Sequence, residues 1–147
     1  VIRAWGGPEK GMTAMRGTEW RPYSPETFLC PPFPSYISGH SCVSGACAET
    51  LRLFTGDDHF GNEVKWVPGI LTEPHNARDT VTLTFPTFTT TADMAGISRV
   101  LGGYHIQSDN VEGLNVGRQV AAQVWKKYLK HIGSPGDNNK ESVSLKK

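Results

Sequence analysis

The chain has 147 residues, of which 37% are hydrophobic and 20% charged, and its formal net charge is +1. These values are ordinary for a soluble globular domain, and a net charge so close to zero gives no reason to expect nucleic-acid binding. No segment approaches the roughly 18 consecutive apolar residues that a membrane-spanning helix requires.

The first third of the chain, residues 1–36, is rich in glycine and proline. Segments such as Gly6-Gly7-Pro8 and Pro31-Pro32 are typical of turns and extended chain, so we expect irregular structure rather than helix there. The chain's only Arg-Pro pair, Arg21-Pro22, lies in this third. We interpret Arg21 as a structural arginine in a loop.

A first helix is predicted for residues 39–54, because apolar residues recur there at helical spacing. Ser38 or Ser41 can cap its first turn, and Thr55-Gly56 has the composition of a helix end. The free backbone N–H groups of such a first turn attract phosphate-like anions. Ser-Gly-His alone fits a capped helix start as well as it fits a binding site.

Residues 57–86 form a predicted long insertion, within which the alternating segment 81–85 favours a strand. A second helix is expected at 87–101, with Thr87 as its cap. A third helix should begin at Ser108 or Asp109 and end at Gly133. Its predicted apolar stripe consists of Leu114, Gly117, Val120, Ala121, Val124 and Tyr128. Gly113 and Gly117, four residues apart, would let another helix approach closely.

The last residues, 134–147, have few apolar side chains and are predicted to be a disordered polar tail. We therefore expect one domain over residues 1–133, followed by this tail.

Two motifs far apart in the sequence carry the candidate chemistry. Ser38-Gly39-His40 opens the first helix, and Ser98-Arg99 is followed by Gly102-Gly103-Tyr104-His105. The glycine pair should end the second helix, leaving Arg99 on the helix and His105 in the loop beyond it. Two imidazoles, one guanidinium and a helix start are the groups needed to hold a tetrahedral oxyanion.

The order Ser-Gly-His, then Ser-Arg-x5-His-x3-Asp ending at Asp109, resembles the signature shared by type 2 phosphatidic-acid phosphatases and vanadium-dependent haloperoxidases. Trp5-Gly6-Gly7-Pro8 and Trp20-Arg21-Pro22-Tyr23 resemble the soluble haloperoxidase branch. The similarity runs over most of residues 1 to about 130. With the predicted helices, it implies an all-α helical bundle of the haloperoxidase/acid-phosphatase type.

The resemblance also implies a role for each matching residue. His105 would ligate vanadium in a peroxidase or form a phosphohistidine in a phosphatase, and Asp109 would hydrogen-bond its far nitrogen. His40 would be the acid/base beside the apical oxygen. Arg99, Ser38 and the Gly39 amide would bind the equatorial oxygens. Phe33 would lie beside the oxyanion, at the position associated with halide preference.

One motif of the superfamily is absent. A lysine should lie seven positions before an Arg-Pro pair, but Ala14 stands seven positions before Arg21. Because the chain also begins at Val1, we expect it to be the C-terminal part of a longer protein. The bundle would then be incomplete, with an uncovered apolar face that favours homo-oligomers, and the fragment itself could be inactive.

The sequence thus predicts a vanadate-dependent enzyme that oxidises halide or a small organic substrate with hydrogen peroxide. A soluble acid phosphatase acting through a phosphohistidine is the alternative within the same superfamily. A non-catalytic structural or oligomerisation module that keeps the fold is a further alternative. Cellular location is left open by the sequence, including secretion.

Overall fold

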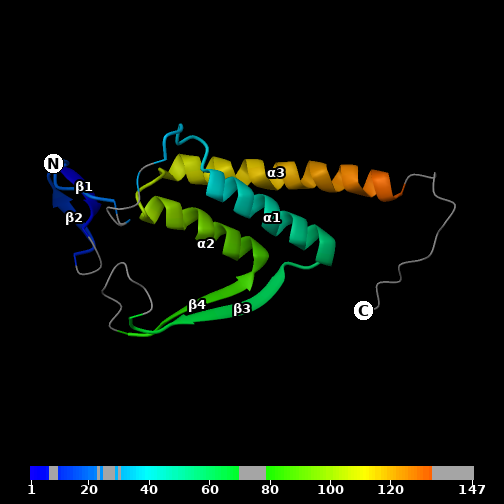
Figure 1. The fold of residues 1–147 in the computed structure, drawn as a ribbon, viewed down its shortest axis with the longest axis horizontal. Coiled ribbons are helices and arrows are strands. Elements are labelled where there is room, and N and C mark those ends of the chain that lie inside the picture. The colour runs from blue at the N-terminus through cyan, green and yellow to red at the C-terminus, as the bar shows by residue number, and fades with distance from the viewer. Residues whose placement is uncertain (7–9, 23, 25–28, 30, 70–78, 134–147) are drawn as a thin grey trace.

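The computed structural model describes residues 1–6, 10–22, 24, 29, 31–69 and 79–133 (Figure 1). Seven elements follow one another in the chain: β1 (Ile2–Trp5), β2 (Met12–Met15), α1 (Gly39–Thr55), β3 (His59–Trp66), β4 (Val81–Thr87), α2 (Phe88–Leu101) and α3 (Gln107–Ile132). The three helices pack together, and the predicted tail lies outside the described residues. No helix in the described part of the chain is long and apolar enough to cross a membrane.

The all-α prediction is wrong, because two antiparallel two-stranded sheets accompany the helices. β1 pairs with β2, and next to the paired residues the Gly6 N–H donates to the Gly11 carbonyl at 2.8 Å. β3 pairs with β4 in an arm that runs from the far end of α1 to the start of α2 (Figure 1). Both sheets pair strands that are consecutive in the chain and lie outside the contacts between the helices. The apolar spacing from which the helices were predicted therefore gives no sign of them.

Strand β4 was predicted in part, as residues 81–85, but its partner β3 was not. β3 contains an irregularity between His59 and Asn62, where Gly61 has a φ of 65°. This bulge breaks the alternation by which a strand is recognised in a sequence. His59, which lies in the predicted insertion 57–86, is the first residue of β3.

Helix α1 has the predicted ends. The Ser38 side chain accepts a hydrogen bond from the Ser41 backbone N–H, and Gly56 adopts the left-handed conformation with a φ of 74°. Ser41, Gly45 and Ala48 are buried at helical spacing, so one face of α1 is turned to its neighbours. Ser38, rather than Ser41, is therefore the cap.

Helices α1 and α3 cross at glycines, as predicted for Gly113 and Gly117. A Cβ atom on Gly117 would collide with the Cys42 carbonyl oxygen and lie 2.9 Å from the Ala46 nitrogen. A Cβ atom on Gly113 would lie 2.7 Å from the Ser38 carbonyl oxygen. The two backbones approach so closely that no side chain fits between them.

A buried polar contact joins all three helices at this crossing. The Ser41 hydroxyl lies 2.9 Å from the Ser38 hydroxyl and 2.8 Å from Asn110 Oδ1. Gly96 of α2 faces the same group, since a Cβ atom there would collide with the Asn110 side chain. Next to it lies a small apolar core of Ala48, Ala92 and Leu114, with Phe88 packed against it.

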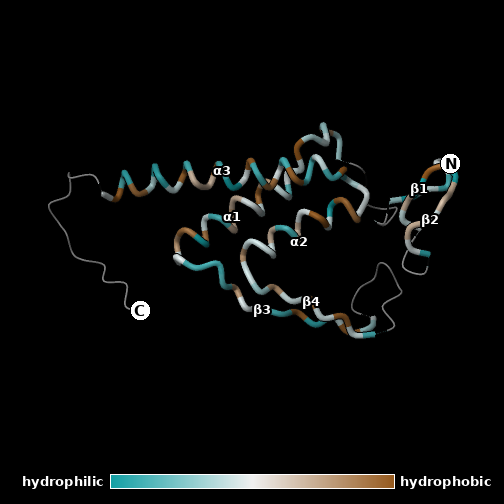
Figure 2. Tube along the Cα trace, turned by 180° about the vertical axis from the view of Figure 1, so that it is seen from behind, coloured by the Kyte–Doolittle hydropathy of each residue, from teal (hydrophilic) through white to brown (hydrophobic). Residues whose placement is uncertain are grey.

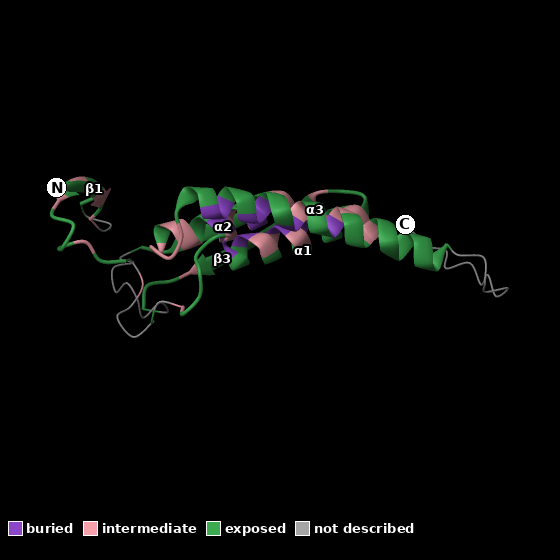
Figure 3. Cartoon of the chain, turned by 90° about the horizontal axis from the view of Figure 1, so that it is seen from above, coloured by how far each residue is buried: buried purple, intermediate pink, exposed green. Residues whose placement is uncertain are grey.

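Helix α3 starts at Gln107, after Ile106, so the predicted start at Ser108 or Asp109 is one or two residues late. The predicted stripe is buried only in part: Leu114, Gly117 and Ala121 are buried, whereas Val124 is 58% exposed. Figure 3 shows the buried residues gathered where the helices face one another, and Figure 2 shows apolar residues along the second half of α3, of which Val120, Val124 and Leu129 are exposed. The uncovered apolar face expected from the sequence is thus present.

Candidate functional site

The predicted site lies where α1 begins, α2 ends and α3 begins, at one end of the bundle (Figure 1). The loop between α2 and α3 turns at Gly103, which has a φ of 82°. The Arg99 carbonyl then accepts hydrogen bonds from the backbone N–H groups of Tyr104 at 3.1 Å and His105 at 3.4 Å. This turn folds His105 back towards the helix that carries Arg99.

A pocket of about 80 Å³ occupies this end of the bundle. Five predicted site residues line it: Phe33, Gly39, His40, Arg99 and His105. Pro31, Ser35 and Tyr104 complete the wall. The structure therefore brings together both motifs, which are about sixty residues apart in the chain.

Ser38 does not line the pocket. Its side chain is fully buried and its hydroxyl oxygen faces Ser41, whose backbone N–H lies 3.3 Å away. Its own backbone N–H donates to the Asp109 carbonyl at 3.1 Å, which ties the start of α1 to the start of α3. Ser38 thus holds the neighbouring Gly39 and His40 in place, and its hydroxyl is turned to the helix interface.

Asp109 lies behind His105 rather than on the pocket wall. His105 Nδ1 and Asp109 Oδ2 are 3.2 Å apart, and the two side chains are only 8% and 3% exposed. Burial alone raises the pKa of the Asp109 carboxyl, but hydrogen bonds from His105, Ser35 and the Ile106 backbone N–H outweigh it and hold that pKa below its ordinary value. Because an ionised carboxylate can only accept, its contact with Asp109 favours a proton on Nδ1, and in the neutral ring with that tautomer the lone pair lies on Nε2.

Arg99 offers a buried donor to the pocket. Its Nε atom is buried and has no hydrogen-bond partner in the described part of the chain. The guanidinium carbon lies 4.3 Å from the centre of the Tyr104 ring. Buried polar atoms are nearly always hydrogen-bonded, so an unpartnered guanidinium nitrogen on a pocket wall points to a ligand as its missing acceptor.

His40 is held in its neutral form. Loss of hydration, the positive charge of Arg99 and the proximity of His105 together lower the pKa of His40 from its ordinary value of 6.5. A neutral imidazole at the start of α1 can accept a proton at neutral pH.

We expect the His40 ring to titrate with a midpoint below 6.5 in the folded chain, and Arg99→Gln to raise that midpoint because one cation is removed. The ring proton signals of His40 followed by NMR against pH measure both. His131, exposed in the last turn of α3, is the internal control, since its signal should not respond to the change at Arg99. A midpoint at or above 6.5 in the wild-type chain would contradict this electrostatic arrangement.

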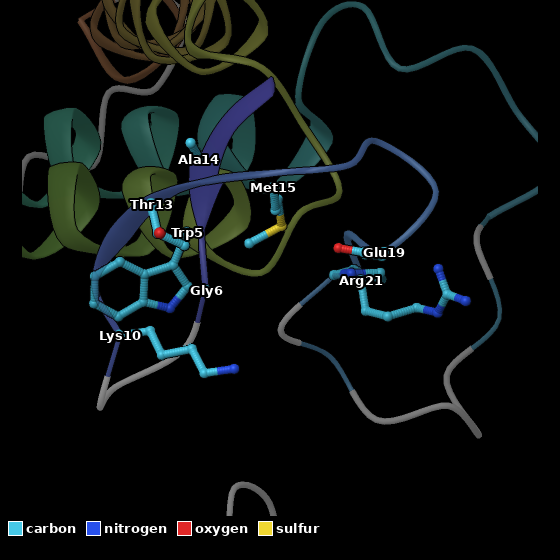
Figure 4. Close-up of a pocket in the computed structure, with 9 residues that line it drawn as sticks. Trp5, Gly6, Lys10, Thr13, Ala14, Met15, Glu19 and Arg21 are labelled. Carbon is cyan, nitrogen blue, oxygen red and sulfur yellow. The ribbon is translucent and has the colours of Figure 1, made fainter. Parts of the chain in front are cut away.

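A larger pocket of about 470 Å³ lies at the N-terminal hairpin (Figure 4). Trp5, Lys10, Glu19 and Arg21 are among its lining residues, and none of the predicted site residues is. Arg21 Nη1 donates to the carbonyls of Thr18 at 3.0 Å and Trp20 at 2.9 Å. These contacts fit the structural role expected of Arg21.

Four contributors to the site were not predicted from the sequence. Pro31 and Tyr104 line the pocket, Ser35 hydrogen-bonds Asp109, and Asn110 joins the buried contact at the start of α1. Tyr104 lies within the second motif and Ser35 lies three residues before the first, and these positions are the only sign of them in the sequence. Within the described residues, no group of three or more His, Cys, Asp or Glu side chains could hold a metal ion.

The chain matches, over residues 1–134, a family model described as the VCPO second helical-bundle domain. Its structure resembles a bacterial vanadium-dependent chloroperoxidase in the holo form, with a TM-score of 0.72 and 26% identity over 90% of this chain and 28% of that chain. The apo form matches equally well, covering 89% of this chain and 28% of that chain, at 26% identity and a TM-score of 0.72.

A bacterial vanadium-dependent iodoperoxidase is 32% identical, with a TM-score of 0.54, over 75% of this chain and 24% of that chain. The chain therefore spans little more than a quarter, 28%, of the length of the chloroperoxidases that it resembles. No curated protein matches it.

Proposed function

Because the chain belongs to the VCPO second helical-bundle domain family, we propose that the intact protein is a vanadate-dependent peroxidase that oxidises halide with hydrogen peroxide. The related chloroperoxidases and iodoperoxidase are vanadium-dependent enzymes, which supports vanadate as the cofactor. The observation that carries the proposal is the buried Arg99 Nε, unpartnered within the described residues, on a wall shared with His40 and His105.

The pocket residues fit a tetrahedral oxyanion. Arg99 supplies a cation with a free donor, and the first turn of α1 supplies backbone N–H groups and the positive end of the helix dipole. A Cβ atom on Gly39 would meet nothing within 4 Å, so the space before this backbone is open to a ligand. His105 has a ring nitrogen left over after its contact with Asp109.

In this proposal His105 Nε2 would ligate the vanadium, with Asp109 fixing the ring tautomer. Arg99 and the Gly39 amide would hold the oxygens of the oxyanion, with Ser38 as the cap behind them. His40, neutral at rest, would accept and return a proton at the pocket. Phe33 would border the halide side of the pocket. Bound vanadate supplies a Lewis-acidic centre for activating hydrogen peroxide, with no change in metal oxidation state.

Two measurements test the function. Orthovanadate titrated into the chain should show saturable binding by calorimetry, and the intact protein should brominate a small organic substrate only with vanadate, bromide and hydrogen peroxide present. Turnover of p-nitrophenyl phosphate without vanadate would instead favour a phosphatase in which His105 attacks phosphorus. If the protein neither binds vanadate nor turns over either substrate, the proposed function is wrong, and a non-catalytic module that keeps the fold is the remaining alternative.

A further inference from the structure

The guanidinium of Arg99 is held by the face of an aromatic ring. Its central carbon lies 4.3 Å from the centre of the Tyr104 ring, a cation–π distance. Tyr104 lines the same pocket, so the ring lies at the site itself. The N–H groups of a guanidinium all lie in its plane and point outward along its edge.

This kind of contact differs from an ion pair in its consequence for binding. A carboxylate partner would accept the N–H donors of an arginine and neutralise its charge. A ring face attracts the cation but accepts none of the edge donors in the guanidinium plane. In the described part of the chain Arg99 forms no ion pair, and its buried Nε has no acceptor. The charge of Arg99 and its Nε–H donor therefore have no counterpart among these residues.

The Tyr104 ring is itself held firmly. It folds back onto Gly102, where an added Cβ atom would lie 3.1 Å from the ring carbon Cε2. The next residue, Gly103, is covered by the segment Trp20–Pro22, because a Cβ atom there would lie 2.8 Å from Pro22 Cβ. The Tyr104 backbone N–H donates to the Arg99 carbonyl at 3.1 Å. Arg99 and Tyr104 are thus joined twice, by a backbone hydrogen bond and by the contact between the guanidinium and the ring.

We propose that Tyr104 is a positioning residue, whose ring face fixes the Arg99 guanidinium so that its N–H edge stays free for the oxygens of a tetrahedral oxyanion. The identity of that oxyanion as vanadate rests on the proposed function, whereas the ring–guanidinium clamp does not. The clamp makes two predictions, one for the ligand-free chain and one for binding.

In the ligand-free chain, the Nε–H proton of Arg99 should resonate upfield because of the ring current of Tyr104. Its signal is assigned by its loss in Arg99→Lys. Tyr104→Phe should keep the upfield position, since the ring remains, whereas Tyr104→Leu and Tyr104→Met should lose it. An unchanged Arg99 signal in the two aliphatic variants would overturn the clamp. Circular dichroism spectra confirm that each variant is folded.

In the binding experiment, Tyr104→Leu should weaken orthovanadate binding roughly 2- to 30-fold, the range that a cation–π contact gives. Tyr104→Phe should bind like the wild type. Tyr128→Leu is the matched control, because Tyr128 packs on Trp125 near the far end of α3. Equal weakening in Tyr104→Phe and Tyr104→Leu would assign the effect to the hydroxyl and overturn the proposal. If the wild-type chain binds no vanadate, the proposed function fails, and the NMR signal decides the clamp.

Discussion

Gly117→Ala is expected to destabilise the chain by about 1–3 kcal/mol, although alanine is favoured over glycine inside a helix by about 1 kcal/mol. The added methyl group would collide with the Cys42 carbonyl oxygen and lie 2.9 Å from the Ala46 nitrogen. Both atoms belong to the backbone of α1, so no side chain can turn aside and the whole helix must shift. Urea unfolding followed by circular dichroism measures the loss.

Gly39→Ala is the matched control for this prediction. Gly39 is also a helical glycine, but an added Cβ atom meets nothing within 4 Å. This variant should be at least as stable as the wild type, while its methyl group beside the pocket weakens vanadate binding. If Gly117→Ala unfolds at the wild-type urea concentration, the close crossing of α1 and α3 does not stabilise the fold in the way described.

Replacement of the two histidines should separate binding from catalysis in the intact protein. His105→Ala is expected to abolish tight vanadate binding, because the ligating nitrogen and its orientation by Asp109 are lost together. His40→Ala should leave vanadate bound while the rate of bromination falls by roughly 10²–10⁴-fold, the usual contribution of a general acid–base group. Vanadate titration followed by rate measurement at saturation tests both.

His131→Ala, in the exposed last turn of α3, is the control for the loss of an imidazole far from the pocket. It should change neither vanadate affinity nor rate. An equal loss of vanadate affinity in His40→Ala and His105→Ala would show that the roles of the two residues have been divided wrongly.

Much of the site could be predicted because its residues lie in two short motifs. The caps Ser38 and Thr87 and the stop at Gly56 follow from local backbone chemistry, and the structure confirms them. The family match confirms the resemblance to vanadium-dependent haloperoxidases that Ser-Gly-His and Ser-Arg-x5-His indicated. Gly113 and Gly117 predicted a close helix approach because four-residue spacing places both on one helix face.

What could not be predicted depends on contacts between distant segments. The sequence does not show that Ser38 turns its hydroxyl to Ser41, because Asn110 and Gly96, which complete that contact, come from two other helices. It also gives no hint that the Tyr104 ring lies under Arg99, a geometry set by the turn at Gly103. The two hairpins were not predicted as such, because β3 is irregular between His59 and Asn62 and because β1 and β2 are too short to show a clear alternation of apolar and polar residues.

The convergence of three helix ends on one pocket has a thermodynamic consequence. Gly39 and His40 come from α1, Arg99 from α2, and His105 precedes α3, so the unfolded chain offers an oxyanion no comparable site. A ligand that binds only the folded chain stabilises it, by about 2.7 kcal/mol at a free concentration one hundred times the dissociation constant. Under the proposed function, oxyanion binding and folding would be linked equilibria, and an occupied pocket would hold the three helices together.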